Sequence, residues 1–386
     1  MSHIFDLFNR MEKARVRLEL TGDHLKINVM TGGDLPPELL AELKERKEEI
    51  IAFLLRKVNS KAIPVQEKRE YYPLSSTQKR LYILQQLDPQ ATVYNVPHFI
   101  SLEKDIDKGR LSGAFDQLLA RHEALRTSFI SLDGEPVQRI YGQVAFELEL
   151  FRAAGRSGQG PERGVSSAQD WQLTIIQGFI RPIDLGRAPL LRVGLVEEAN
   201  RCLLMVDMHH IITDAASMKI LVKDFMAFFH GEKLPPLKLH YKDFAVWQQG
   251  PVYREMLKPQ ERFWLDHLSG ELPVLGLPLD YARPEVQSFA GNAIGFILMG
   301  EDGQQFRDMA QSLGVTPFML GLAIFSLLLA KLSGQEDIVI GTPIATRRHA
   351  DLEPIIGMFV NTLALRHFPA GDKLLHDYML EVKDRT

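Results

Sequence analysis

The stretch Leu203-Leu-Met-Val-Asp-Met-His-His-Ile-Ile-Thr-Asp-Ala-Ala-Ser217 decides how the rest of the chain is interpreted. Its apolar run, residues 202–208, predicts a buried strand, and the residues after Asp214 show apolar positions at helical spacing. Two adjacent histidines, His209 and His210, lie where that strand ends, and Asp214 lies where the helix begins. An α/β protein places its chemistry at the carboxyl end of a buried strand. We therefore expect a functional site here.

The two histidines are not expected to share a role. Adjacent strand side chains point to opposite faces, so one imidazole can face an open channel while the other packs inside. In a chain with 12 histidines, a histidine pair followed four residues later by aspartate arises by chance in roughly 2% of cases. A neutral imidazole is often satisfied within a core, so the motif alone favours function only modestly.

Composition excludes several function classes. The chain has 386 residues, enough for about two or three domains, and its 45% hydrophobic content is ordinary for a soluble globular protein. A net charge of -4 without a basic concentration argues against nucleic-acid binding. The single cysteine, Cys202, excludes a disulfide framework and fits a reducing cytoplasm. No signal peptide is recognisable, and the longest apolar stretch, residues 317–332, predicts a buried helix rather than a membrane span.

Residues 1–58 are predicted to form a separate small domain. The pattern predicts an amphipathic helix over 4–14, a β-hairpin over 17–29 and a second helix that begins at residue 35 with prolines in its first turn. A domain of this size has a small core, so we expect a partner or a second copy to complete it. Residues 59–70 are polar and are predicted to be a linker.

Residues 71–275 and 276–386 are predicted to form two α/β lobes. Helices are expected after an N-cap at Ser75 and over 111–125, 240–247 and 316–332. Strands are expected over 137–150, 190–196, 202–208, 289–299 and 337–341. Residues 153–167, rich in glycine and serine, are expected to be an exposed loop.

Five separated strings resemble the condensation domains of non-ribosomal peptide synthetases. In the family's order they are Leu74-Ser-Ser-Thr-Gln-Lys-Arg-Leu-Tyr-Ile-Leu84, Arg121-His-Glu-Ala-Leu-Arg-Thr-Ser-Phe129, Met208-His-His-Ile-Ile-Thr-Asp-Ala-Ala-Ser217, Tyr241-Lys-Asp-Phe-Ala-Val-Trp247 and Ile356-Gly-Met-Phe-Val-Asn-Thr362. Five strings in order are specific, although each alone is weak, and the resemblance covers roughly four fifths of the chain. It implies an α/β fold of two lobes, similar to chloramphenicol acetyltransferase.

The chain departs from the family's pattern in two places. Ala215 replaces the glycine of the family's H-H-x-x-x-D-G, a change that a helix start tolerates if φ is negative. Residues 373–386 end within an amphipathic helix, where the family continues with further strands. We therefore expect the second lobe to be incomplete, which leaves the activity of this chain open.

The first 58 residues resemble, less specifically, the N-terminal αββα docking domains of some synthetase subunits. The resemblance implies that residues 1–58 bind the C-terminal tail of the preceding subunit, plausibly as an added strand on the hairpin edge. The same domain could also support a dimer. The alternative is a structural appendage that only aids solubility.

The resemblance also implies the chemistry. An amine attacks a thioester, and both substrates are carried on the 4′-phosphopantetheine arms of donor and acceptor carrier proteins. His210 would face the tunnel between the lobes and hydrogen-bond the amine, as base or as positioning group; imidazole suits proton handling at neutral pH. No metal-ligand spacing, glycine-rich phosphate loop or nucleophilic cysteine is recognisable, so no cofactor or metal is expected on this chain.

The other motif residues are expected to have structural roles. His209 should pack or orient the loop, while the family implies a buried ion pair between Asp214 and Arg347. Loss of one partner of such a pair costs about 3–5 kcal/mol. Ser217 is expected to cap a helix or line the tunnel, and Asn361 to stabilise a strand crossing. Arg121, Glu123 and Arg126 are expected to fasten the end of the helix that precedes Phe129 to the start of the following strand.

Several alternatives stay open from the sequence. An epimerisation domain shares the fold and the histidine motif, and a heterocyclising relative would carry D-x-x-x-x-D in place of the histidines. A free-standing acyltransferase that uses coenzyme A would not need carrier proteins. The chain could also be a docking scaffold without catalysis. The substrates and their stereochemistry are not readable, although the motifs lean towards L-configured donors and acceptors.

Overall fold

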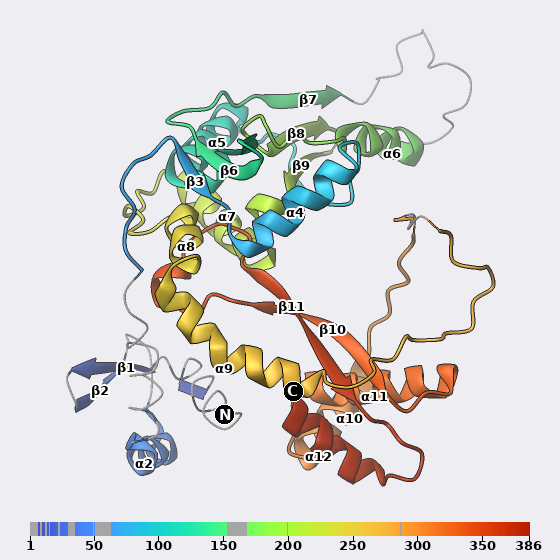
Figure 1. Ribbon diagram of the computed structural model, residues 1–386. Helices are drawn as coiled ribbons and strands as arrows, with labels where there is room; N and C mark the ends of the chain where they lie inside the picture. The colour runs from blue at the N-terminus through green and yellow to red at the C-terminus, as the bar shows by residue number, and fades with distance from the viewer. Residues whose placement is uncertain are drawn as a thin grey trace. The chain divides into compact units, whose positions relative to one another are not determined.

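The computed structural model describes residues 7, 10–11, 14, 16–21, 24–29, 35–48, 50, 63–152, 168–198, 200–285, 288–289 and 291–386 (Figure 1). The chain divides into two compact units, residues 1–65 with 347–353 and residues 66–346 with 354–386. The loop predicted over 153–167, most of the helix predicted over 4–14 and residues 51–58 lie outside the described residues.

The first unit contains the predicted hairpin. Strands β1 (Val16–Thr21) and β2 (His24–Val29) pair antiparallel, from Val16 opposite Val29 to Thr21 opposite His24. Helix α2 (Pro37–Glu45) begins with proline in its first turn, as predicted, because proline has no N–H to leave unpaired there. The small apolar core of this unit comprises Leu7, Met11, Val16, Leu39, Leu43 and Ile50.

The largest described sheet of the second unit has four strands, in the order β4-β9-β8-β7. Its strands are β4 (Asn95–Glu103), β7 (Leu148–Arg152), β8 (Leu191–Glu197) and β9 (Arg201–His209). β9 pairs antiparallel with both neighbours, and β8 and β9 form a hairpin over the strands predicted at 190–196 and 202–208.

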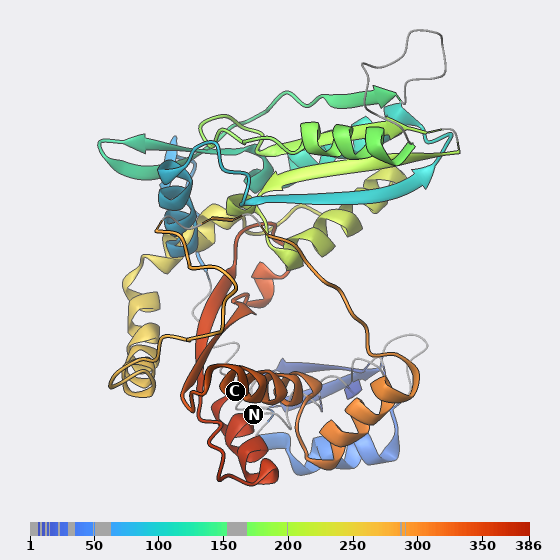
Figure 2. The same cartoon turned by 90° about the vertical axis from the view of Figure 1, so that its right-hand side faces the viewer.

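Both faces of β9 are covered by helices. Leu204, Val206 and Met208 pack into the core that includes α5 (Lys108–Arg121) and α7 (Ala215–Phe229). Leu203 and Met205 pack on the other face, beside α6 (Ala168–Phe179) (Figure 2). Burial on two faces explains the continuous apolar run of this strand.

Shorter elements surround this sheet. A three-stranded sheet has the order β3 (Tyr71–Pro73), β6 (Glu135–Ile140) and β5 (Thr127–Leu132). Helix α4 (Ser76–Leu87) begins at the predicted N-cap, where Ser75 and Gln78 form a reciprocal capping box. Two further helices, α8 (Tyr241–Gln248) and α9 (Pro251–His267), follow α7 along the chain.

The rest of the second unit is a two-stranded sheet with three helices. Strands β10 (Ile338–Ala345) and β11 (Val360–His367) pair antiparallel, with Ile344 opposite Asn361. The helices are α10 (Gly300–Ser312), α11 (Pro317–Ser333) and α12 (Leu375–Arg385). No single helix in the described part of the chain is long and apolar enough to cross a membrane; α10 and α11 pass that test only together, across a bend of 100°.

Three sequence predictions need correction. Residues 291–299 form no strand, and their side chains Ile294 and Phe296 are 93% and 85% exposed, because no described strand pairs with this segment. α11 is buried only on the face that carries Leu320 and Ala323, while Ile324 is exposed. Residues 137–150 belong to two strands, β6 and β7, since residues 141–147 leave the sheet. Hydrophobic patterns report the preference for burial, and cannot report whether a partner surface is present.

Candidate functional site

His210 lies at the end of β9, where the chain leaves the strand for a 3₁₀ turn, His210–Ile212. Its backbone N–H donates to the carbonyl oxygen of Tyr94 at 2.8 Å. Its ring Nδ1 lies 2.7 Å from the carbonyl oxygen of Thr213, which can only accept, so Nδ1 carries the proton. The other ring nitrogen, Nε2, is therefore a hydrogen-bond acceptor in the neutral ring, and the residue is half-buried.

His209 has a different environment, as predicted for adjacent residues of a strand. Its ring is fully buried, with Nδ1 3.1 Å from the donating N–H of Ile211 and Nε2 3.2 Å from Oε1 of Gln85. Burial, with a smaller contribution from the neighbouring His210, lowers the pKa of His209 to about 4. His209 is thus a neutral, fully hydrogen-bonded ring at physiological pH, which supports an orienting role.

Asp214 caps helix α7 and also contacts the segment before β11. Its Oδ1 accepts from the backbone N–H of Ser217 at 2.7 Å, and its Oδ2 accepts from that of Phe359 at 3.1 Å. Ser217 is fully buried, and its Oγ lies 2.9 Å from O and 3.0 Å from N of Gly357. The start of α7 therefore holds the backbone of residues 357–359. Ala215 has no strained backbone, because Asp133 is the only described non-glycine residue with positive φ.

Tyr241 brings two more of the sequence strings to the same segment. Its hydroxyl donates to the carbonyl oxygen of Met358 at 2.5 Å, and Thr77 Oγ1 donates to the same oxygen at 3.0 Å. The rings of Tyr241 and Phe359 lie 4.8 Å apart. A Cβ on Gly357 would lie only 1.9 Å from Cδ2 of Tyr241, so glycine is required here by space. Four of the five strings thus meet around one backbone segment.

The Arg121–Phe129 string fastens the neighbouring elements together. Arg121 donates to Oδ2 of Asp224 on α7 at 2.8 Å. Arg126 donates to the carbonyl oxygen of Leu119, in α5, at 2.6 Å, and also to that of Tyr141. Within the described residues, neither arginine hydrogen-bonds His210.

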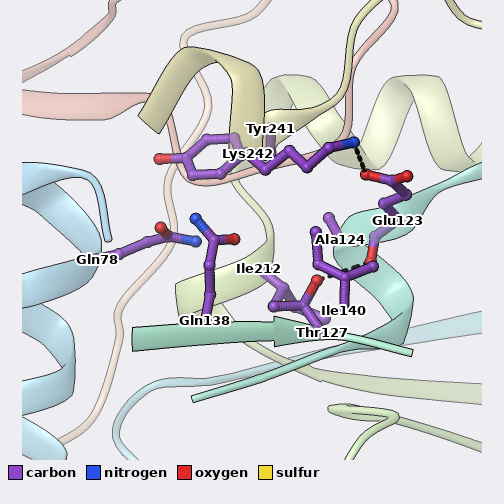
Figure 3. Close-up of a pocket in the computed structure, with 9 residues that line it drawn as sticks. All are labelled: Gln78, Glu123, Ala124, Thr127, Gln138, Ile140, Ile212, Tyr241 and Lys242. Carbon is purple, nitrogen blue, oxygen red and sulfur yellow. Dashed lines mark hydrogen bonds and ion pairs between the residues drawn. The ribbon is translucent and has the colours of Figure 1, made fainter. Parts of the chain in front are cut away.

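Glu123 forms an ion pair with Lys242 beside a narrow, closely packed space that is also lined by Gln78, Gln138 and Tyr241 (Figure 3). The amide groups of Gln78 and Gln138 also point into this space (Figure 3). Gln78 Nε2 donates to the carbonyl oxygen of Ile211 at 3.3 Å, so the string at the start of α4 supports the histidine turn. The sequence alone did not identify Asp224, Lys242 or Gln85, since each acts through a contact with a distant segment.

Two open cavities are lined by elements that carry the sequence strings or adjoin them. One of about 530 Å³ lies between β4 and α7 and is lined by His98, Phe99, Ile100, Met218, Lys219, Val222 and Lys223. The other, of about 410 Å³, includes Thr77, Phe244 and Asn361 in its lining, so Asn361 faces a cavity from β11.

The described residues contain no group of three metal-ligating side chains. The predicted ion pair joins residues of different compact units, and Asp214 with Arg347 stays a prediction.

We expect the free energy of unfolding to decrease as the pH is lowered from about 6.5 to about 4. Burial lowers the pKa of His209 and of the fully buried His367 to about 4, against 6.5 for a free histidine. Above pH 6.5 neither state binds a proton at these rings. Below it the unfolded chain binds protons that the folded chain does not, so each ring reduces the free energy of unfolding by about 1.4 kcal/mol per pH unit.

The measurement is urea unfolding at pH 7.5, 6.5, 5.8 and 5.0. His367→Leu removes one titrating ring whose two nitrogens have no hydrogen-bond partner among the described residues. The slope of the free energy of unfolding against pH should therefore decrease by the contribution of about one proton. The exposed His376 offers the matched control, His376→Leu. Equal slopes for the His367 variant and the unmodified chain would contradict the expectation.

Comparison with known proteins gives consistent matches over the whole chain. The family described as "Condensation domain" matches residues 68–386, and the "TubC N-terminal docking domain" matches residues 4–55. Tyrocidine synthase 3 of Brevibacillus parabrevis is 46% identical over 332 residues, which cover 86% of this chain and 5% of that protein. Bacitracin synthase 2 of Bacillus licheniformis is 41% identical over 391 residues, which cover 99% of this chain and 14% of that protein. The chain thus spans a small part of these relatives.

Solved structures match the fold. A four-domain nonribosomal peptide synthetase, holo-AB3403 bound to AMP and glycine, has a TM-score of 0.73 at 25% identity, with 85% of this chain and 24% of that chain covered. The EpoB cyclization-docking bidomain from Sorangium cellulosum has a TM-score of 0.69 at 21% identity, with 99% and 76% covered. The second likeness concerns the fold alone.

Proposed function

The chain belongs to the condensation-domain family of non-ribosomal peptide synthetases, with a TubC-type docking domain at its N-terminus, and from this premise we propose that it forms peptide bonds between carrier-bound substrates. The amine of an acceptor aminoacyl group attacks the thioester carbon of a donor acyl or peptidyl group. The carbon–sulfur bond breaks, the donor carrier's arm leaves as a thiol, and the amine loses one proton.

The position of His210 Nε2 carries this proposal. The Nδ1–H of the ring is committed to the Thr213 carbonyl, so Nε2 can accept a hydrogen bond from the attacking amine. An imidazole in this tautomer can take the proton that the amine loses, or it can align the lone pair of the amine with the thioester carbon. Because the thioester is already activated, holding the two substrates in line contributes most of the acceleration.

The test is amide formation by this chain with a donor-loaded and an acceptor-loaded carrier protein, with products measured by mass spectrometry of the carrier arms. We expect a product that stays on the acceptor carrier and requires both carriers. Equal turnover with coenzyme A thioesters would favour a free-standing acyltransferase. No turnover, with carrier binding retained, would favour the scaffold alternative.

We also propose that residues 1–58 bind the C-terminal tail of a preceding synthetase subunit. The support is the antiparallel hairpin β1–β2 together with the match of residues 4–55 to a docking family. A two-stranded hairpin has two edges at which a peptide can add a strand. Sedimentation of the chain alone and with such a tail peptide tests this and distinguishes tail binding from a dimer through the same domain.

A further inference from the structure

Gln85, in the last turn of α4, contacts the buried histidine that precedes His210. Its Oε1 lies 3.2 Å from Nε2 of His209, and both side chains are buried. Because the N–H of Ile211 donates to Nδ1 of His209 at 3.1 Å, Nδ1 must be unprotonated and the ring proton must be on Nε2. Gln85 therefore provides the acceptor for this buried N–H.

The orientation of the Gln85 amide is determined by its other end. Its Nε2 lies 3.3–3.4 Å from the carbonyl oxygens of Asp88, Pro89 and Ala91. These oxygens can only accept, so the NH₂ group faces them and Oε1 faces His209. The same loop continues to Tyr94, whose carbonyl oxygen accepts the backbone N–H of His210. One loop thus contacts both histidines, the first through Gln85 and the second through its own backbone.

We propose that Gln85 is a positioning residue for the condensation reaction, which acts through His209 to hold the turn that presents Nε2 of His210. This inference rests on the proposed function. The tautomer of His209 with its proton on Nδ1 would place two donors, that N–H and the N–H of Ile211, against each other. Without the oxygen of Gln85, neither tautomer of His209 satisfies both of its ring nitrogens.

The expected consequence is displacement of the turn. A buried N–H without an acceptor is destabilising by an amount comparable to the net stabilisation from the hydrogen bonds that hold a single turn. The ring of His209 therefore reorients, Ile211 loses its acceptor, and His210 moves with the 3₁₀ turn. A displacement of about 1 Å at a reacting group can lower a rate about 100-fold.

The primary test is Gln85→Met, which preserves volume but removes the acceptor, against the matched control Gln86→Met at the exposed neighbour. Long-range ¹⁵N–¹H NMR of the imidazole rings, recorded on the full chain, reports the tautomers of His209 and His210 without turnover. We expect the His209 pattern to change in Gln85→Met only, and kcat with loaded carriers to fall about 10–100-fold with KM nearly unchanged. An unchanged His209 tautomer, or an unchanged kcat, overturns the proposal.

Gln85→Glu provides a second test if the methionine variant does not fold. The introduced carboxylate can still accept from His209, but its second oxygen then faces the carbonyl oxygens of Asp88, Pro89 and Ala91 without a donor, and protonation of that oxygen removes the repulsion. Activity relative to the unmodified chain should therefore recover as the pH is lowered, and a ratio independent of pH overturns the proposal. Absence of turnover in the unmodified chain would refute the proposed function instead, whereas the tautomer of His209 is measured independently of turnover.

Discussion

His210→Ala is expected to lower the rate of amide formation about 10²–10⁴-fold, the range for loss of a positioned proton-handling group. The variant removes the Nε2 acceptor and leaves the rest of the turn in place, because the His210 backbone N–H still donates to the Tyr94 carbonyl. The exposed His230, whose Nδ1 bonds the carbonyl of Met226, offers a matched control in His230→Ala. Single-turnover reactions with both carriers loaded in advance measure the chemical step.

Stability separates a catalytic role of His210 from a structural one. The ring hydrogen-bonds the Thr213 carbonyl oxygen through Nδ1, and loss of that bond should lower the free energy of unfolding by only about 0.5–1.5 kcal/mol. A variant that is folded and inactive is the expected result. An unchanged rate of condensation would refute both roles proposed for this ring, base and positioning group.

Asp214→Ala is expected to lower the free energy of unfolding by about 1.5–5 kcal/mol, with a lower melting temperature and lost activity. The variant removes the cap of α7, worth about 0.5–2 kcal/mol, and leaves the buried N–H of Phe359 without this acceptor, which costs about 1–3 kcal/mol. The carboxylate thus holds α7 to the segment that leads into β11. A stable but inactive Asp214→Ala protein would contradict this structural role.

A double-mutant cycle tests the ion pair proposed between Asp214 and Arg347. If the two side chains interact, Arg347→Met and Asp214→Ala will be non-additive by about 1–3 kcal/mol. Glu353→Ala in place of the arginine variant is the control, and its effect should add to that of Asp214→Ala. If the effects of the arginine and aspartate variants add within about 0.5 kcal/mol, the proposed ion pair is contradicted.

The sequence predicted a strand correctly where the folded chain supplies a pairing strand, and wrongly where it does not. β9 was predictable because both of its faces are buried and its side chains are apolar throughout. The segment 289–299 has similar apolar composition but no strand partner among the described residues, so the same reasoning failed there. Periodicity records which side chains favour burial, while pairing depends on a second segment that the local pattern does not contain.

By itself, the sequence determined the family, the hairpin of the first unit and the separation of two histidines into different environments, because each follows from local order along the chain. Only the tertiary structure decided which nitrogen of His210 is free, that Gln85 orients His209 and that Gly357 leaves space for Tyr241. Hydrogen bonds over 2.5–3.3 Å require a donor and an acceptor to meet at a defined distance and angle. The pairs Gln85–His209 and Gly357–Tyr241 are each separated by more than a hundred positions and meet only in the folded chain. Nδ1 of His210 contacts the carbonyl oxygen of Thr213, which is close in sequence, because the chain turns after β9.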